Sequence, residues 1–273
     1  MEYFEFVEAM RDEVEKLMDE GIRVESHTAV KNNGRQRKGL VIIREGINIS
    51  PTIYQEEFYE QYQNGSDIPD LAQSVLNLYD KIKVNQSYPC ENILSFDKIK
   101  DQIVYKLINK KWNEKLLTEV PYTDFLDLAV VFYIILEHSD FGNATVMIRN
   151  EHIRQWGITA EDLYKISVEN TNRILPVEIN KMTDFMYVLT NSNRSLGASA
   201  ILYSGFCEKL SGMLGGKFYI LPSSIHELII IPESYGIDKE HLQMMVEEIN
   251  ETEVEQEEVL SDNVYYYDGE LIR

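Results

Sequence analysis

Apolar residues recur at spacings of three and four along several stretches of the chain, which is the spacing of one face of an α-helix. In residues 2–20 the pattern ends at Gly21, and its apolar positions are Phe4, Val7, Met10, Val14, Leu17 and Met18. Similar patterns predict further helices at about 52–64, 67–83, 150–156, 160–172, 204–214 and 239–250.

Alternating or continuous apolar runs predict β-strands between these helices. Asn33-Gly34 lies between Arg23–Val30 and Gly39–Arg44, and this dipeptide predicts a hairpin. Phe125–Leu136 and Ala144–Ile148 are expected to pair antiparallel, with Gly142-Asn143 near their turn. Ile103–Ile108 is a strand or the end of a helix that continues from Phe96, and the other expected strands are Ile47–Ser50, Met186–Leu189, Phe218–Leu221, His226–Ile231 and Val264–Tyr267.

This mixture predicts an α+β fold with mixed or antiparallel sheets flanked by helices. The pattern weakens over residues 84–99, where Tyr88-Pro89 interrupts any helix. We therefore expect one compact body or two lobes, an N-terminal one at residues 1–88 and a C-terminal one at 89–273.

Two segments of the chain echo one another. Gly157–Leu163 (GITAEDL) resembles Gly236–Leu242 (GIDKEHL), and each places a capping residue, Thr159 or Asp238, before a predicted helix. A good cap followed by an acidic first turn is a local reason for the likeness. Duplication of an α/β unit is the alternative.

The net charge of the chain limits the classes of partner that it is expected to bind. The 26 basic and 46 acidic residues give a net charge of −20, which opposes binding to nucleic-acid phosphates or to an anionic membrane. Seven glutamates lie between Glu247 and Glu258, with no basic residue among them. This run is a solvated helix end and connector, or it is a docking site for a basic protein through Glu255, Glu257 and Glu258.

Cysteine usage and hydropathy predict a cytoplasmic protein. Cys90 and Cys207 form no C-x-x-C pair, which argues against a disulfide framework or a zinc ribbon. No apolar stretch has the length of a membrane helix, and the acidic, amphipathic N-terminus lacks the pattern of a signal peptide.

Hydroxyl, imidazole and carboxylate groups lie close together in the sequence at residues 223–227. Ser223 or Ser224 with His226 and Glu227 could form a hydrolase site in which the imidazole deprotonates the hydroxyl. However, neighbouring residues on a strand face opposite ways, and Pro-Ser-Ser between strands is ordinary turn chemistry. A tight turn with a hydrogen-bonded His226 is therefore the favoured interpretation.

A polar loop at residues 191–198 is a second candidate site. Its backbone amides, with Asn191 and Arg194, could hold an anion, although a loop that caps a helix explains the same residues. The sequence has no glycine-rich phosphate motif, and its histidines are scattered. We therefore expect no metal site and no cofactor.

Several stretches spread over the chain carry a family resemblance. They include Asn48–Tyr54, Ile103–Asn109, Trp156–Thr159, Leu221–Glu227 and Val259–Asp262. Through them the chain resembles an uncharacterised bacterial family, domain-of-unknown-function family 5688. A fainter similarity, through the Trp-Gly-Ile-Thr helix start and the strands around Pro222, connects it to unknown-function family 1444. Neither resemblance implies an activity or a catalytic residue.

The leading hypothesis is a non-enzymatic binding or interaction protein that uses an acidic surface or a groove. A hydrolase that uses His226 with Ser223 or Ser224 is the second hypothesis. A small-molecule or metal sensor is the third.

Overall fold

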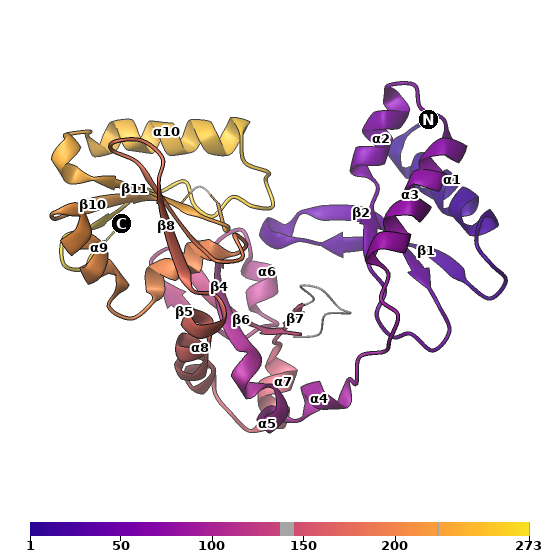
Figure 1. The fold of residues 1–273 in the computed structure, drawn as a ribbon, viewed down its shortest axis with the longest axis horizontal. Coiled ribbons are helices and arrows are strands. Elements are labelled where there is room, and N and C mark those ends of the chain that lie inside the picture. The colour runs from indigo at the N-terminus through magenta and orange to yellow at the C-terminus, as the bar shows by residue number, and fades with distance from the viewer. Residues whose placement is uncertain (137–144, 223, 273) are drawn as a thin grey trace. The chain divides into compact units, whose positions relative to one another are not determined.

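The structure is a computed structural model that describes residues 1–136, 145–222 and 224–272. The chain divides into two compact units (Figure 1). Unit 1 comprises Met1–Lys31 and Arg35–Cys90, and unit 2 comprises Asn32–Gly34 and the described residues from Glu91 onward. All strand pairs in the described part of the chain are antiparallel, in three sheets, so the predicted α+β class is confirmed.

Unit 1 places helices against a small sheet of order β1-β2-β3. The hairpin predicted at Asn33-Gly34 is present, with Arg23 opposite Ile43 and Val30 opposite Gln36. Asn33 adopts a left-handed φ of 58°, as expected of the Asn in such a turn. The elements are α1 (Tyr3–Lys16), β1 (Arg23–Val30), β2 (Gln36–Ile43), β3 (Thr52–Tyr54), α2 (Glu56–Gln63) and α3 (Ile68–Ile82).

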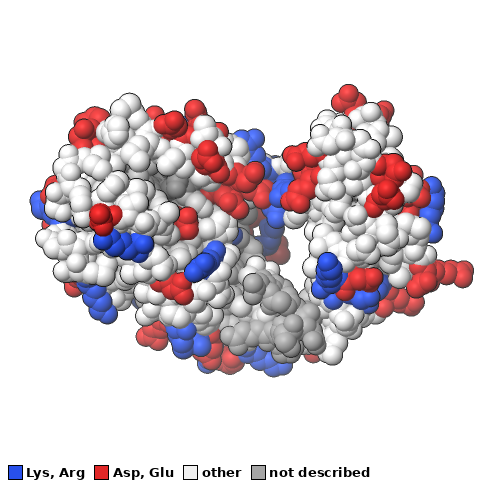
Figure 2. All heavy atoms as spheres, turned by 45° about the horizontal axis from the view of Figure 1, so that its top comes forward, with Lys and Arg blue, Asp and Glu red and all other residues white. Residues whose placement is uncertain are grey.

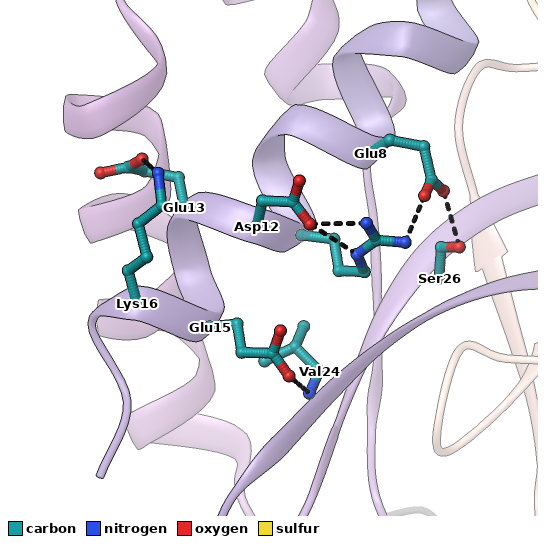
Figure 3. Close-up of polar contacts among 8 residues, drawn as sticks. Glu8, Asp12, Glu13, Glu15, Lys16, Val24 and Ser26 are labelled. Carbon is teal, nitrogen blue, oxygen red and sulfur yellow. Dashed lines mark hydrogen bonds and ion pairs between the residues drawn. The ribbon is translucent and has the colours of Figure 1, made fainter. Parts of the chain in front are cut away.

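The acidic face of α1 is used to hold this helix in place. Glu8 accepts a hydrogen bond from the Ser26 hydroxyl on β1 at 2.8 Å, and Glu15 accepts one from the Val24 amide at 3.3 Å (Figure 3). Arg11 forms ion pairs with Glu8 and Asp12. The opposite face of α1 buries the apolar positions Phe6, Val7, Met10 and Val14. These carboxylates therefore have structural partners within unit 1.

Two predictions for unit 1 are wrong. Ile47–Ser50 is not a strand, and the third strand of the sheet is Thr52–Tyr54, where Ile53 is buried opposite Leu40. The helix predicted at 52–64 consequently begins only at Glu56. Pairing with β2 overrides the helical spacing of residues 52–54, because it buries Ile53 in the core.

Unit 2 contains two sheets. One has the order β13-β12-β10-β11-β9-β8, and in the other β6 lies between β4 and β5 and also pairs with β7. Its helices are α4 (Glu91–Leu94), α5 (Phe96–Ile99), α6 (Glu114–Leu117), α7 (Asn150–Trp156), α8 (Ala160–Ile174), α9 (Phe206–Leu214) and α10 (Lys239–Thr252). Its strands are β4 (Ile103–Asn109), β5 (Tyr122–Phe125), β6 (Leu128–Ile135), β7 (Thr145–Met147), β8 (Val177–Lys181), β9 (Tyr187–Asn191), β10 (Phe218–Leu221), β11 (Leu228–Pro232), β12 (Tyr265–Tyr267) and β13 (Leu271–Ile272).

Helix α8 packs along β4. The buried Thr171 hydroxyl accepts the Tyr105 amide hydrogen bond at 3.1 Å, and the Asn170 side-chain amide donates to the Ile103 carbonyl at 3.0 Å. These bonds satisfy backbone groups of β4 that β6 does not pair, which protects the strand edge. Ile103–Ile108 is therefore a strand, and the alternative of a helix continuing from Phe96 is wrong.

Helix α10 lies over the larger sheet, as the yellow helix in Figure 1 shows. Leu242 and Val246 are completely buried and pack with Leu221 and Ile231 of β10 and β11. The next residue of this buried stripe, four positions after Val246, is Asn250. The fold therefore directs a polar amide to the inner face of α10 near its C-terminal end.

The strand predicted at Phe125–Leu136 is in fact two strands. Phe125 ends β5 and Leu128 begins β6, and Leu126 between them has a φ of 54°. The apolar residues hid this turn because leucine rarely adopts a positive φ. β7 pairs with β6 as predicted, while the turn expected at Gly142-Asn143 lies outside the described residues.

Both echoed segments begin helices. Thr159 caps α8 and Asp238 caps α10, and each helix follows a left-handed glycine, Gly157 or Gly236. The duplication of a unit stays a prediction, as does the domain boundary between residues 88 and 89.

In the described part of the chain, no helix combines the length and the apolar character needed to cross a bilayer.

Candidate functional site

Three of the segments that the sequence singled out meet at His226. Its Nδ1 atom accepts a hydrogen bond from the Leu196 amide at 3.1 Å, and its Nε2 atom lies 3.3 Å from Glu258 Oε1. Because Nδ1 is an acceptor, the neutral ring carries its proton on Nε2, which faces the carboxylate. The imidazole therefore joins the 191–198 loop to the acidic segment after α10.

The backbone around His226 is closely packed. The His226 carbonyl accepts hydrogen bonds from the Gly197 amide at 3.0 Å and from the Thr190 hydroxyl at 2.9 Å. A Cβ atom on Gly197 would lie 2.6 Å from that carbonyl and 2.7 Å from the Asn191 nitrogen. Only glycine fits this approach, which explains why the loop carries Gly197.

The hydroxyl and carboxyl candidates lie apart from the imidazole nitrogens. Ser224 Oγ accepts a hydrogen bond from the His226 backbone amide at 3.0 Å, and the Glu227 side chain is exposed. Ser223 lies outside the described residues. The contacts of His226 resemble the hydrogen-bonded turn that the sequence favoured, and the hydrolase role of these residues stays a prediction.

Asn191 and Arg194 have different environments within their loop. Asn191 is completely buried, accepts from the Asn193 amide at 3.0 Å and donates to the Ser195 carbonyl at 2.9 Å. The exposed Arg194 has a φ of 50°, within the turn that Asn191 braces. Asn191 thus shapes the loop, and binding of an anion by Arg194 stays a prediction.

The acidic segment after α10 is fixed to the body of unit 2. The Glu258 carbonyl accepts from the Ile225 amide at 2.8 Å, and the Glu257 carbonyl accepts from the Asn32 side chain at 2.9 Å. The Glu255 carbonyl accepts from the amides of Glu258 and Val259. Docking through Glu255, Glu257 and Glu258 would therefore use an ordered segment of the chain.

A hollow that was not predicted from the sequence lies beside this segment. It has a volume of about 450 Å³ and lies within unit 2. It is lined by Trp112, Glu247, Asn250, Glu251, Gln256, Val259 and Asp262. We call it the α10 hollow. It brings an aromatic ring from the turn after β4 to acidic residues of α10 and of the segment that follows.

Asn250 is the buried polar residue of the α10 hollow. It is 4% exposed, and its Nδ2 atom donates to the Ser261 carbonyl at 3.1 Å and to Asp262 Oδ1 at 2.9 Å. Its Oδ1 atom is buried and has no hydrogen-bond partner among the described residues. An unpaired buried acceptor is unusual in a folded protein. The apolar spacing of α10, interrupted by an asparagine, was the signal in the sequence for this site.

The like charges around the α10 hollow repel one another. Glu247 and Glu251 are four residues apart on α10, near the C-terminal end, where the helix dipole is negative. The last turn of α10 has no basic residue. Within the described residues, Glu247, Glu251 and Asp262 form no ion pair. Figure 2 shows acidic side chains on the face that carries α10.

A second cluster of polar side chains in unit 2 surrounds Asp127 and is internally satisfied. Asp127 accepts hydrogen bonds from Tyr265 at 2.6 Å and from Ser261 and Asn263 at 2.8 Å. Burial raises the pKa of Asp127, but these three hydrogen bonds outweigh it and hold the pKa below its usual value. We interpret this cluster as a structural connection between the β5–β6 turn and the segment before β12.

The described residues contain no group of three or more His, Cys, Asp and Glu side chains that could hold a metal ion. The carboxylates of the α10 hollow are thus arranged as an acidic surface rather than as a compact ligand set.

The fold places this chain in the α+β class, and the α10 hollow gives it an acidic candidate site. A family model described as a family of unknown function, DUF5688, matches residues 3–186 and 183–269. The chain belongs to this family. No curated protein and no solved structure matches it significantly. The similarity to family 1444 stays a prediction.

Proposed function

We propose that this chain is a non-enzymatic binding protein that captures a basic protein partner through the C-terminal half of α10. The observation that carries the proposal is the set of exposed carboxylates there, which have no ion-pair partner within the described residues. Repulsion between like charges and the negative end of the helix dipole both raise the free energy of this surface. A bound cationic segment would offset both effects.

The carboxylates of α1 make a useful contrast. Glu8 and Glu15 are hydrogen-bonded to β1, and Glu8 is also paired with Arg11 (Figure 3). Their charge is used within unit 1. These two carboxylates of α1 therefore have partners within unit 1, whereas Glu247 and Glu251 of α10 form no ion pair within the described residues.

The bacterial cytoplasm is the compartment that we propose. Cys90 and Cys207 are both free thiols, which suits a reducing environment. Burial raises the pKa of the Cys207 thiol to about 11, so this side chain is a poor nucleophile at neutral pH. The resemblance to a bacterial family supports the same assignment.

The hydrolase alternative draws on one observation, the contact between His226 and Glu258. A carboxylate beside an imidazole can orient a general base. However, the other ring nitrogen accepts the Leu196 amide, so His226 could take a proton from a hydroxyl only after one of these contacts opened. The binding function requires no such rearrangement.

The binding proposal is tested with a fluorescent lysine- and arginine-rich peptide and an uncharged peptide of equal length. We expect the basic peptide alone to bind, with an affinity that falls as salt rises. The double variant Glu247→Lys with Glu251→Lys should weaken binding at least about tenfold, because it reverses charge at the proposed surface. Fluorescence anisotropy measures both effects.

The matched control is Glu57→Lys with Glu60→Lys on α2, whose side chains are exposed. It changes the net charge by the same amount in unit 1. If both double variants weaken binding equally, the peptide senses only total charge and the α10 surface is not the site. Replacing Glu255, Glu257 and Glu258 by Lys tests whether the following segment extends the surface.

A further inference from the structure

We infer that the α10 hollow is a pocket for the guanidinium group of an arginine side chain on the basic partner. This inference rests on the proposed binding function and specifies the chemistry of its central contact. The residues that line the hollow of about 450 Å³ include a tryptophan, three acidic residues and the buried Asn250. Pockets of this size bind small ligands or single side chains.

The indole of Trp112 is presented by a fixed turn. The Trp112 backbone amide donates to Asn109 Oδ1 at 2.9 Å, and the buried Asn109 side chain donates to the Leu260 carbonyl at 3.0 Å. Asn109 thereby ties the turn that carries Trp112 to the segment that leads to Asp262. Although tryptophan is a large apolar residue, Trp112 is 38% exposed. An exposed ring held beside carboxylates suits a cation–π contact.

The carboxylates that line the α10 hollow are also positioned before a ligand binds. Asn250 donates to Asp262 Oδ1 at 2.9 Å, and the Gln243 side chain donates to Glu247 Oε1 at 3.0 Å. These bonds restrict two of the three carboxylates before any ligand arrives. Asn250, whose buried Oδ1 atom has no hydrogen-bond partner among the described residues, lines the same hollow. A cationic ligand with several N–H donors would therefore find acceptors that need little reorganisation.

Arginine fits this arrangement better than the other cations of proteins. Its planar guanidinium stacks on an aromatic face and still directs five N–H donors outward in its plane. The ammonium of lysine is a compact, strongly hydrated charge that gains less from an indole. A divalent metal ion needs converging ligands, and the described residues contain no such group.

The test compares two capped peptides of equal length, one with arginines and one with lysines at the same positions among glycines. We expect the arginine peptide to bind about fivefold more tightly, and Trp112→Ala to remove this preference. Trp112→Phe should retain part of it, because a phenyl ring keeps an aromatic face. The matched control is Trp156→Phe, since Trp156 stacks on His152 on α7, outside the hollow.

A second measurement keeps the test decisive if Trp112→Ala folds poorly. In the unaltered protein, the indole N–H signal of Trp112 should shift on titration with the arginine peptide, while the signal of Trp156 stays in place. Equal affinity for the two peptides, with an unmoved Trp112 signal, would overturn the guanidinium pocket. The binding function would survive that result if Glu247→Lys with Glu251→Lys still weakened binding at least about tenfold, and it would fail if neither peptide bound.

Discussion

At the scale of single residues, two buried asparagines and the half-buried Asp127 of unit 2 connect segments that are distant in the sequence. Asn109 joins the turn after β4 to residue 260, and Asn250 joins α10 to Asp262. Asp127 gathers donors from three residues between positions 261 and 265. Buried polar groups stabilise a fold only when their partners are in place, so such residues define the positions of irregular segments. These side chains therefore fix the position of the segment at residues 260–265.

Asp127 gives a prediction for the pH dependence of stability. Its folded-state pKa is lowered, so its stabilising contribution is complete above its unfolded pKa of about 4 and is lost as pH falls through the folded value. Asp127→Asn cannot accept all three hydrogen bonds and should reduce the free energy of unfolding by about 1–3 kcal/mol at pH 7. Urea denaturation at pH 7 and near pH 3 measures the loss.

The difference between Asp127→Asn and the unaltered protein should shrink at the lower pH, because the stabilising contribution of the carboxylate declines once the pH is below its unfolded pKa and approaches the lowered folded pKa. Asp124→Asn is the control on the same hairpin. Asp124 is exposed and paired with Lys110, and such surface pairs contribute about 0–1 kcal/mol. An equally large effect of both substitutions would contradict the assigned role of Asp127.

At the scale of elements, the sequence predicts well where local chemistry and packing agree. The helices α3, α7, α8 and α10 match their predicted ranges closely, because local chemistry and apolar spacing agree, whereas α1 ends at Lys16, before the predicted stop at Gly21. The short strands β5, β8 and β13 were missed because two to five residues carry little periodic signal. The turn at Leu126 was not predicted, because leucine is not a residue type that indicates a turn.

The residues of the candidate site also divide into those that local sequence patterns indicate and those that only tertiary packing brings together. The 191–198 loop, His226 and Glu258 were each singled out from local patterns, but their meeting depends on sheet pairing between distant strands. The α10 hollow was missed because Trp112 and Glu247 are far apart in the sequence and approach only through tertiary packing. Composition identified the acidic run, while only the structure identified the aromatic residue beside it.

The cap of α8 gives a prediction at this scale. Thr159 Oγ1 accepts from the Asp162 amide at 3.1 Å, and Asp162 accepts from the Thr159 amide at 2.9 Å, which completes a capping box. Thr159→Ala should lower the free energy of unfolding by about 1 kcal/mol. Ser95→Ala is the control, because Ser95 precedes α5 without a side-chain cap bond and should change stability little. Thermal or urea unfolding measures both, and equal losses would refute the capping argument.

At the scale of the whole molecule, unit 1 has the properties of an independent domain. Its core is assembled from α1, the three-stranded sheet and α3, through completely buried residues that include Phe6, Leu40 and Val75. A segment without regular structure, residues 83–90, follows α3. Asn48 holds this segment in unit 1 by hydrogen bonds to the carbonyl and the amide of Tyr88 at 2.7 and 2.9 Å. Domain boundaries commonly fall just after such a segment.

We therefore predict that residues 1–90, produced alone, fold cooperatively, in agreement with the domain boundary proposed near residue 88. Urea unfolding followed by circular dichroism and by tyrosine fluorescence should give one coincident transition. A shorter fragment, residues 1–64, is the matched control. It keeps α1 and the sheet but lacks α3, whose Leu71, Ala72 and Val75 are fully or almost fully buried. Because their loss exposes the apolar face of α1, the shorter fragment should show no cooperative transition. If residues 1–90 also unfold without a transition, unit 1 depends on the rest of the chain and the two-domain proposal is wrong.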